Sequence, residues 1–461
     1  MVAANSVRTL PLTAPAPITG RPVIVGAGWS GLACAIALVR QGHRPLVLDA
    51  APQAGGRARS FAHDLGGAVV ELDNGQHLLL GAYSATLDLM RDVGIDCTSA
   101  LAGSPFALTY ADGWRLAAAP LPAPWHLAAG LLAARGMSLA ERWSLVRWTR
   151  REASTGWRLA APDTPAAALF AGEPATLVRR LWRPLCLAAL NVELEQASSC
   201  MLLNVLRDSL GARAADSRLL VPRVGLSRLF PEAAIAWLRA HGAEVRLHSA
   251  VTALEPDGAG ARHTVHLRDE RIAAGHVVLA LPADRAADLL DGKHVALQSA
   301  TALLRALRFA PIATVYLRYA AGTRLTRPVM TLFDEAHSGN HGQWAFDRGA
   351  LDPSMDGIVS VVISGEGPYR ALERNALGEA VAKQLRTALG LPAPLAHYAI
   401  TEKHATIVPA PGLLRPQAVL PVAGLYLAAD SADSPYPSTI EASVRTGIAA
   451  AAAIGPLETL R

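Results

Sequence analysis

The 461-residue chain contains little cysteine and little lysine. A metal site or a disulfide framework is not expected, because the four cysteines form no C-x-x-C pair and no repeating spacing. Only three of the 43 basic residues are lysine, the net charge is +5, and no basic run is interleaved with aromatic residues. Nucleic-acid binding therefore has no support in the sequence. The cysteines are Cys34, Cys97, Cys186 and Cys200.

Long hydrophobic runs are also lacking. The longest uncharged stretch, Leu116–Ala134, contains Pro120, Pro122 and Pro124, which would break a spanning helix, so no transmembrane segment is expected. Met1–Gly20 has no continuous apolar core, which argues against a secretory signal and favours a cytoplasmic protein. With 51% hydrophobic and 18% charged residues, the chain has the composition of a globular protein with a large core.

Three stretches are typical of parallel α/β structure. Pro22–Ala50 predicts a strand, a glycine-rich turn, a helix to about Arg40 and a second strand. Two further strand regions are expected within 244–282, around Val245–Leu254 and His276–Leu281. A strand at Leu425–Ala428 and a helix from about Thr439 follow. We therefore expect a discontinuous nucleotide-binding domain of the α/β class, formed by 20–80, 201–290 and 405–461. An α+β substrate domain, formed by 81–200 and 291–404, is inserted in it.

A dinucleotide fingerprint follows the first predicted strand. In the run Gly26-Ala27-Gly28-Trp29-Ser30-Gly31, the three glycines suit a tight turn, a close approach to a diphosphate and the packing of helix on strand. The helix N-terminus would bind the diphosphate. Asp49, followed by Ala50 at the end of the second strand, is placed to accept hydrogen bonds from a ribose, and its charge disfavours NADP.

A second glycine-rich turn, Gly55-Gly56-Arg57-Ala58-Arg59-Ser60, follows Asp49. Gly56 and Arg57 could hold the diphosphate from its other side. The alternative is a solvated basic loop, since turns containing glycine and arginine are common.

These motifs resemble the flavin amine oxidase and carotenoid desaturase superfamily, at the N-terminus and again at Leu427-Ala428-Ala429-Asp430 and Pro437-Ser438-Thr439-Ile440-Glu441. The resemblance implies an FAD-binding Rossmann-like fold of the glutathione-reductase type. It implies that Asp430 holds the ribityl or diphosphate part and that the backbone of Thr439 and Ile440 meets the flavin ring. It also implies that Val251, expected on a middle strand, meets the adenine.

Longer strings narrow the resemblance to the squalene-associated desaturase-like flavoproteins, the hydroxysqualene dehydroxylases of hopanoid synthesis. The strings are Leu72-Asp73-Asn74-Gly75-Gln76-His77-Leu78-Leu79-Leu80-Gly81-Ala82-Tyr83, Leu181-Trp182-Arg183-Pro184-Leu185-Cys186, Ala188-Ala189-Leu190-Asn191 and Leu220-Val221-Pro222-Arg223-Val224-Gly225-Leu226-Ser227. The resemblance implies replacement of the hydroxyl of hydroxysqualene by hydrogen, with hydride passing from reduced flavin to an allylic cation, and it places Asn74 and Gly75 near the flavin. A dry apolar cavity for a C30 isoprenoid and a proton donor for the leaving oxygen are then required.

Three residues are candidates for that donor: His77, Asp433 and Tyr436. The alternatives are a histidine bonded to backbone and turn residues bonded within their own loop. Lys293 could serve an amine-oxidase reaction beside the flavin, but its turn-like context, after Asp291-Gly292, favours a surface lysine.

Five of the nine tryptophans lie between positions 110 and 160, alongside Arg135, Arg142, Arg147, Arg150, Arg151 and Arg158. This pattern indicates either a packed core with solvated arginines or a surface that attaches the protein peripherally to the inner membrane. The tryptophans are Trp114, Trp125, Trp143, Trp148 and Trp157.

Other functions stay open on the sequence. A carotenoid desaturase or an amine oxidase would use the same cofactor motifs, and a flavin-free prenyl-lipid carrier that resembles the GDP-dissociation inhibitors would share the architecture. The electron donor is unknown, because no second nucleotide fingerprint is recognisable.

Overall fold

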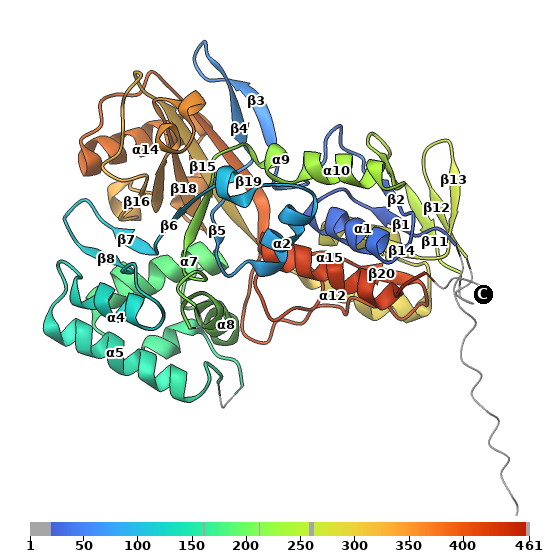
Figure 1. The fold of residues 1–461 in the computed structure, drawn as a ribbon, viewed down its shortest axis with the longest axis horizontal. Coiled ribbons are helices and arrows are strands. Elements are labelled where there is room, and N and C mark those ends of the chain that lie inside the picture. Colours follow the sequence, from blue (N-terminus) through green and yellow to red (C-terminus); the bar gives the residue numbers. More distant parts are fainter. Residues whose placement is uncertain (1–19, 160–161, 212, 258–261, 458–461) are drawn as a thin grey trace, which may run out of the picture.

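The computed structural model describes residues 20–159, 162–211, 213–257 and 262–457. Residues 1–19, in which no secretory signal is expected, lie outside the described part. Two five-stranded sheets organise the molecule, a parallel one and an antiparallel one, with helices packed around them (Figure 1). In the described part of the chain, no helix has the length and apolarity needed to cross a bilayer.

The parallel sheet has the strand order β10-β2-β1-β14-β20, in which every neighbouring pair is parallel. All of its strands except the edge strand β10 are short, apolar and fully buried. This is expected when both faces of a parallel sheet are covered. The strands are β1 (Val23–Val25), β2 (Leu46–Leu48), β10 (Glu244–Arg246), β14 (Val277–Leu279) and β20 (Leu425–Leu427).

Alternate residues of these strands face two different layers. Ile24, Val47 and Val278 pack against one layer of helices, whereas their neighbours Val23 and Leu46 pack against a β-meander and two further helices. The first layer contains α1 (Trp29–Arg40), α10 (Pro231–Ala240) and α15 (Ile440–Ile454). The second contains β11 (Ala253–Glu255), β12 (His263–His266), β13 (Arg271–Ala274), α11 (Ala283–Leu290) and α12 (Gln298–Ala306).

The antiparallel sheet has the order β16-β17-β18-β15-β19. Alternation along β18 again separates two faces: Val361 and Ile363 belong to the core under α14 (Arg374–Leu389), whereas Val362 and Ser364 line a cavity. Its strands are β15 (Phe309–Arg318), β16 (Val329–Thr331), β17 (Trp344–Asp347), β18 (Ile358–Ser364) and β19 (Ala396–Ile407).

A helical layer forms the lower left of the molecule in Figure 1. It contains α4 (Trp125–Leu132), α5 (Leu139–Ser154), α7 (Arg183–Leu190) and α8 (Ser199–Leu210). Further short elements are α2 (Ser84–Asp92), α3 (Cys97–Ala100), α9 (Leu226–Leu229), α13 (Arg348–Leu351), β3 (Ser60–Asp64), β4 (Val69–Asp73), β5 (Leu79–Leu80), β6 (Leu101–Ser104), β7 (Ala107–Thr109), β8 (Arg115–Ala117) and β9 (Leu219–Pro222).

The domain boundaries expected from the sequence stay a prediction, and the core packing argues for two shifts. Helix α12 shares a core with the parallel sheet, although 291–404 is expected in the substrate domain. Helix α8 shares a core with α5 and α7, although 201–290 is expected in the nucleotide domain. In both cases the chain crosses between the domains later than expected, after Leu210 at the end of α8 and after Ala306 at the end of α12.

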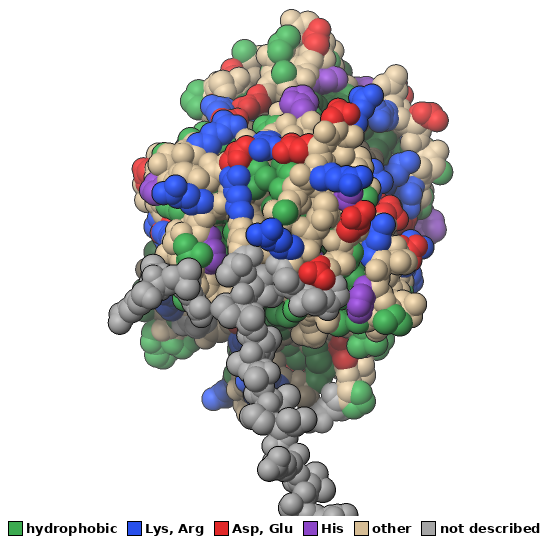
Figure 2. Space-filling view, turned by 90° about the vertical axis from the view of Figure 1, so that its right-hand side faces the viewer, with side chains coloured by type: hydrophobic (Ala, Val, Ile, Leu, Met, Phe, Trp, Pro, Cys, Tyr) green, Lys and Arg blue, Asp and Glu red, His purple; other side chains and the backbone are tan. Residues whose placement is uncertain are grey.

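The end of the molecule formed by the parallel sheet carries mixed charge. Figure 2 shows that Lys and Arg side chains are interspersed with Asp and Glu side chains on this face. Ion pairs of this domain join Arg21 to Glu244 at 2.7 Å and Arg246 to Glu270 at 2.9 Å. Such pairing leaves no surface of one sign here.

Candidate active site

A cavity of about 650 Å³ lies where the two sheets and the helical layer meet. This volume is typical of a site for a small molecule or a cofactor. Residues directly after β1, β2, β14 and β20 line one end of the cavity, which is the carboxyl edge of the parallel sheet where such folds bind ligands. The other end is apolar and is lined by Phe106, Leu185, Leu187, Leu202, Val205, Leu206, Trp344 and Phe346, among others.

The turn between β1 and α1 needs its glycines for three different reasons. Gly26 has φ +113°, and a Cβ there would lie 2.2 Å from the carbonyl oxygen of Ala280. A Cβ on Gly31 would lie 1.9 Å from the carbonyl oxygen of Gly26, so Gly31 permits helix α1 to pack on the strand. Gly28 has no such conflict, since its Cβ position lies 3.9 Å from the Cα of Gly56; it lines the cavity together with Trp29 and Ser30. Helix α1 has no acidic residue in its first turn, so its N-terminus can bind an anion.

Asp49 lies at the same edge of the sheet. Its Oδ2 accepts a hydrogen bond from the backbone N–H of Ala27 at 2.6 Å, and its Oδ1 accepts one from Ala51 at 2.8 Å. Each carboxylate oxygen can accept a further hydrogen bond, so Asp49 can also bind the hydroxyls of a ribose. Ala51 lines the cavity, whereas the predicted Ala50 is exposed and is not among its lining residues.

Arg57 and Asp430 join the two glycine-rich ends of the chain. The Nη2 of Arg57 lies 2.7 Å from Oδ2 of Asp430, and its Nη1 donates to the carbonyl oxygens of His404 and Ala405. The adjacent carboxylate of Asp430 raises the pKa of Arg57 above its usual value despite burial. Asn74 donates through Nδ2 to the carbonyl of Arg57 at 3.0 Å, so this loop also supports the arginine.

Helix α15 begins at the cavity. Thr439 caps it by accepting a hydrogen bond from the N–H of Ala442 at 3.1 Å, and both Thr439 and Ile440 line the cavity. The acid of the first turn, Glu441, is bonded elsewhere: its Oε2 accepts from the N–H of Thr86 at 2.8 Å and from its hydroxyl at 2.6 Å. The positive end of the α15 dipole is therefore available to a ligand that carries negative charge.

His77 lines the cavity next to Gly75, which has φ +115°. Its Nδ1 lies 2.9 Å from the carbonyl oxygen of Gly75, so Nδ1 carries the proton and donates it to this bond. Burial lowers the pKa of His77, and this outweighs the opposite effect of the Gly75 bond and of Asp73. A neutral imidazole with a proton on Nδ1 presents Nε2 as an acceptor, not as an acid.

Tyr436 also lines the cavity, and its hydroxyl donates to Oδ2 of Asp208 on α8 at 2.6 Å. Burial, reinforced by the Asp208 carboxylate, raises the pKa of Tyr436, so the phenol keeps its proton. Asp433 differs: it is exposed, accepts a hydrogen bond from Nε2 of Gln417 at 3.0 Å, and is not among the described residues that line the cavity. Of the two loop candidates, only Tyr436 is placed to reach a ligand.

Val251 lies in no strand of the described chain, contrary to the expectation of a middle strand. Pairing with β12 starts at Ala253, so the chain at Val251 still forms the connection from β10 to β11. Val251 packs against the core beneath the sheet and is not one of the described lining residues of the cavity. Its predicted contact with adenine stays untested.

Several lining residues had no motif in the sequence analysis. Asp208 and Glu402 belong to them, and each reaches the cavity from a segment remote from the glycine-rich turns. The helical spacing of Leu202, Val205 and Leu206 could have indicated an apolar face on α8, but it could not have shown that this face borders a cavity.

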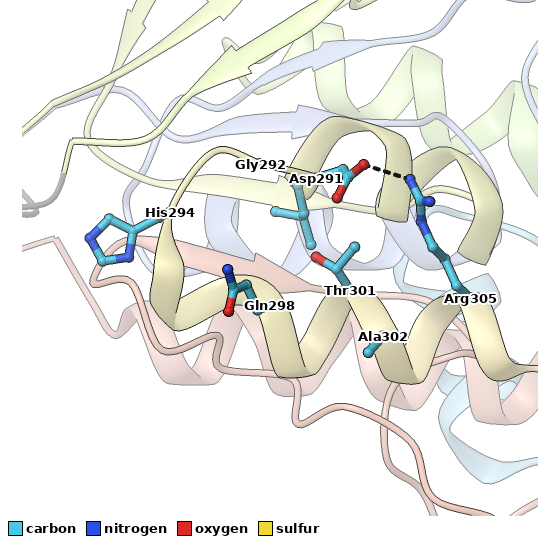
Figure 3. Close-up of a pocket in the computed structure, with 8 residues that line it drawn as sticks. Asp291, Gly292, His294, Gln298, Thr301, Ala302 and Arg305 are labelled. Atoms are coloured by element: carbon cyan, nitrogen blue, oxygen red, sulfur yellow. Dashed lines mark hydrogen bonds and ion pairs between the residues drawn. The ribbon is translucent and has the colours of Figure 1, made fainter.

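A second cavity of about 210 Å³ lies between α11 and α12 (Figure 3). Asp291 and Arg305, which line it, form an ion pair at 2.9 Å. Lys293 is exposed beside this region, and in the described part of the chain none of the three lysines lines the large cavity. The structure thus places Lys293 at the surface.

The parallel sheet, the glycine-rich turn and the cavity are typical of dinucleotide-binding proteins of the α/β class. A family model described as "Flavin containing amine oxidoreductase" matches residues 29–455. The chain therefore belongs to the flavin-containing amine oxidoreductase family.

Individual relatives narrow the comparison. The chain is 32% identical to a hydroxysqualene dehydroxylase of Rhodopseudomonas palustris, covering 93% of this chain and 96% of that one. It is 29% identical to a hydroxysqualene dehydroxylase of Sinorhizobium fredii over the same shares. A zeta-carotene desaturase of Zea mays matches only 16% of the chain, at 36% identity.

Solved structures agree on the fold. A putative protoporphyrinogen oxidase of Exiguobacterium sp. superposes with a TM-score of 0.67 at 17% identity, covering 95% of this chain and 98% of that one. Cyclohexylamine oxidase of Brevibacterium oxydans superposes with a TM-score of 0.65 at 20% identity, covering 94% and 98%. Both confirm the FAD-binding α/β fold predicted from the sequence.

FAD is the cofactor that this family implies, and the cavity fits it. Gly28 and Gly56 line the cavity without side chains, the α1 N-terminus is free of acidic residues, and Asp49 has acceptor capacity left. These residues suit the diphosphate and the adenosine ribose, and the α15 N-terminus suits the flavin ring. The protein is an FAD-dependent oxidoreductase.

Proposed function

We propose that this protein converts hydroxysqualene to squalene in hopanoid or triterpene biosynthesis. The observation that carries the proposal is the combination of relatives of that name along 93% of the chain with a cavity whose far end is apolar. When bound and reduced, FAD would supply the hydride that replaces the hydroxyl. A C30 isoprenoid would lie against α7, α8 and β17, because these elements contribute the leucine and aromatic side chains of the wall.

The side chains of the cavity wall would exclude water and orient the substrate. Phe106, Leu202 and Trp344 belong to a single hydrophobic core that closes this side of the cavity. A water-poor wall protects an allylic cation from capture by water, and aromatic faces stabilise positive charge. Such a wall also favours a hydrocarbon chain over a polar substrate.

We assign the proton donor to Tyr436. The carbon–oxygen bond of the substrate breaks as the phenol proton passes to the leaving oxygen, which departs as water. Asp208 holds the hydroxyl at 2.6 Å and is about one third exposed, so it can return a proton from solvent to the phenolate. His77 is assigned to orientation, because its neutral Nε2 can accept a hydrogen bond from the substrate hydroxyl but has no proton to give.

The test is an anaerobic assay in which reduced holoenzyme meets hydroxysqualene in detergent and squalene is quantified. Wild-type protein is expected to form squalene, Tyr436→Phe to form it at least about 100-fold more slowly, and Asp433→Asn to match the wild type. Flavin content, measured by absorbance, should be equal in all three. Oxidation of an amine or of a carotenoid precursor, without squalene formation, would refute the proposal.

The site of action follows from the substrate. A C30 hydrocarbon partitions into the bilayer, so we propose a cytoplasmic protein attached peripherally to the inner membrane. Each turnover would also consume two electrons from an external donor.

A further inference from the structure

The tryptophan-rich segment predicted for membrane contact divides into two sets. Trp114 and Trp148 are buried, and Trp148 packs against Trp182 with ring centroids 4.3 Å apart. Trp125 and Trp143, in contrast, are 66% and 71% exposed. The buried pair therefore belongs to the core, and only the exposed pair is available to a partner.

The exposed apolar side chains of this segment lie on one surface. Trp125 and Leu132 are seven residues apart on α4, and Leu139 and Trp143 are four apart on α5, so each pair shares a helix face. Leu132 and Leu139 are 77% and 75% exposed. We call these four residues the α4–α5 face.

Arg142 holds the two helices together at this face. Its guanidinium donates to the carbonyl oxygens of Leu131, Leu132 and Ala134 at 3.1, 2.7 and 2.7 Å, and so caps the C-terminus of α4. The end of α4 at Leu132 is thereby held against the first turn of α5, which begins at Leu139. These bonds fix the two helices relative to each other, and with them the two pairs of exposed side chains.

The exposed charges on the segment that carries the face have one sign. Between positions 113 and 159 the only acidic residues are Glu141 and Glu152, and both are buried. Glu141 forms the capping box of α5 with Ser138, and Glu152 pairs with Arg151. The exposed charged side chains of this segment are Arg135, Arg147, Arg150, Arg151 and Arg158.

This pattern contrasts with the opposite end of the molecule, where acidic and basic side chains alternate (Figure 2). Exposed tryptophan and leucine flanked only by arginine match the interface of an anionic bilayer, in which apolar side chains enter the acyl boundary and arginines meet the headgroups. Binding of a soluble protein would not require apolar and basic side chains to be separated along α5 in this way.

We propose that the α4–α5 face docks the protein on an anionic lipid surface. The inference rests on the proposed function, since a membrane-dissolved substrate makes such docking useful. The buried face of α5 packs through Trp148 into the core that also contains the cavity-lining residues Phe106 and Leu202. Docking would bring the apolar end of the cavity within about one helix diameter, roughly 10 Å, of the bilayer.

The experiment is sedimentation of full-length holoprotein with vesicles of phosphatidylcholine, with and without one third phosphatidylglycerol. Wild-type protein is expected to sediment with the anionic vesicles and to be released by salt. The triple variant Trp125→Ser/Leu132→Ser/Trp143→Ser should bind at least about tenfold more weakly. The control Val295→Ser/Leu395→Ser/Leu414→Ser, with side chains 63–74% exposed on other elements, should bind like the wild type.

Further variants test the role of the basic side chains and the insertion of the tryptophans into the bilayer separately. Arg135→Glu/Arg150→Glu should lose the preference for anionic vesicles, whereas Arg271→Glu/Arg285→Glu should keep it. Trp125→Phe/Trp143→Phe should bind but lose most of the fluorescence quenching that brominated lipids cause in the wild type. Squalene formation in detergent should be equal in every variant. A protein that forms no squalene in this assay would contradict the proposed function but not the docking proposal.

The docking proposal is overturned if the wild type stays in the supernatant at low salt, or if both triple variants lose binding equally. It is also overturned if the first triple variant converts a dimer to a monomer and leaves vesicle binding unchanged, because the face would then bind a second copy of the chain.

Discussion

A single ion pair connects residues 373 positions apart in the sequence, since Arg57 of the N-terminal motif contacts Asp430 of the C-terminal one. We expect Arg57→Ala to weaken FAD binding by about 10- to 100-fold, because it removes the bonds to His404 and Ala405 as well and leaves the buried carboxylate of Asp430 unpaired. Fluorescence titration of apoprotein with FAD measures the effect.

Arg57→Lys is the matched control. It keeps the charge but loses the planar fork, so its affinity should lie between those of the wild type and the alanine variant. An alanine variant that binds FAD as tightly as the wild type would show that the pair is not part of the site.

His126 is buried on α4, and neither of its ring nitrogens has a hydrogen-bond partner among the described residues. Such a side chain destabilises the fold, so His126→Leu should raise the free energy of unfolding by about 1 kcal/mol, whereas His126→Ala should lower it by opening a cavity. Thermal denaturation measures both. A leucine variant less stable than the wild type would contradict this account.

The same histidine predicts a pH dependence. Burial lowers the pKa of His126, so below about pH 6.5 the unfolded chain binds a proton that the folded chain does not. Stability of the wild type should therefore fall as the pH decreases through this range, and it should fall less steeply in His126→Leu. Buried His263 and His341, whose pKa values are lowered for the same reason, leave part of the slope in place.

Residues within a contiguous motif could be predicted from the sequence, and residues defined by a distant partner could not. Gly26, Gly28 and Asp49 lie at the cavity because their spacing specifies a strand, a turn and a helix. Asp433 and Tyr436 are only three residues apart in one loop, and nothing local indicates that one faces Gln417 and the other Asp208. That distinction depends on where α8 packs.

At the scale of elements, substitutions at two glycines of the turn before α1 should have different effects, one on folding and the other on cofactor binding. A Cβ on Gly31 would lie 1.9 Å from the carbonyl oxygen of Gly26, so Gly31→Ala should destabilise the protein by about 1–3 kcal/mol. Gly28 has φ −73° and no atom closer than 3.9 Å to its Cβ position, so Gly28→Ala should fold normally. Its methyl group would, however, obstruct the diphosphate, and FAD affinity should fall.

The pair is tested by thermal denaturation of the apoproteins together with FAD titration, and each variant is the control for the other. If Gly28→Ala bound FAD normally, the assignment of this turn to the diphosphate would be wrong.

The parallel strands could be located from sequence because each is a short apolar run beside a turn signal. The predicted region 245–254 combined parts of two strands, β10 and β11, that the structure assigns to different sheets. The antiparallel sheet was less predictable, since β15 pairs with β18 and β19, about 50 and 90 residues away. Register between such distant strands depends on tertiary packing.

At the scale of the whole molecule, the cavity is assembled from segments that are remote along the chain. Gly26, Gly28 and Asp49 come from the first 50 residues, whereas Thr439 and Ile440 come from the last 25. A ligand that reaches from one group to the other contacts both, and its binding energy is available only in the folded state.

This arrangement predicts which nucleotides stabilise the fold. Adenosine diphosphate can reach the α1 N-terminus and Asp49, and flavin mononucleotide can reach the α15 end, but only FAD spans both. In differential scanning calorimetry of apoprotein, FAD at about 100 times its Kd should add about 2.7 kcal/mol of stability, and the two fragments at the same concentration should add less. If flavin mononucleotide raised the Tm as much as FAD, the adenosine would have no place at Asp49. The division of the cavity into a diphosphate end and a flavin end would then fail, and with it the orientation that directs the flavin ring toward the apolar wall formed by α7 and α8.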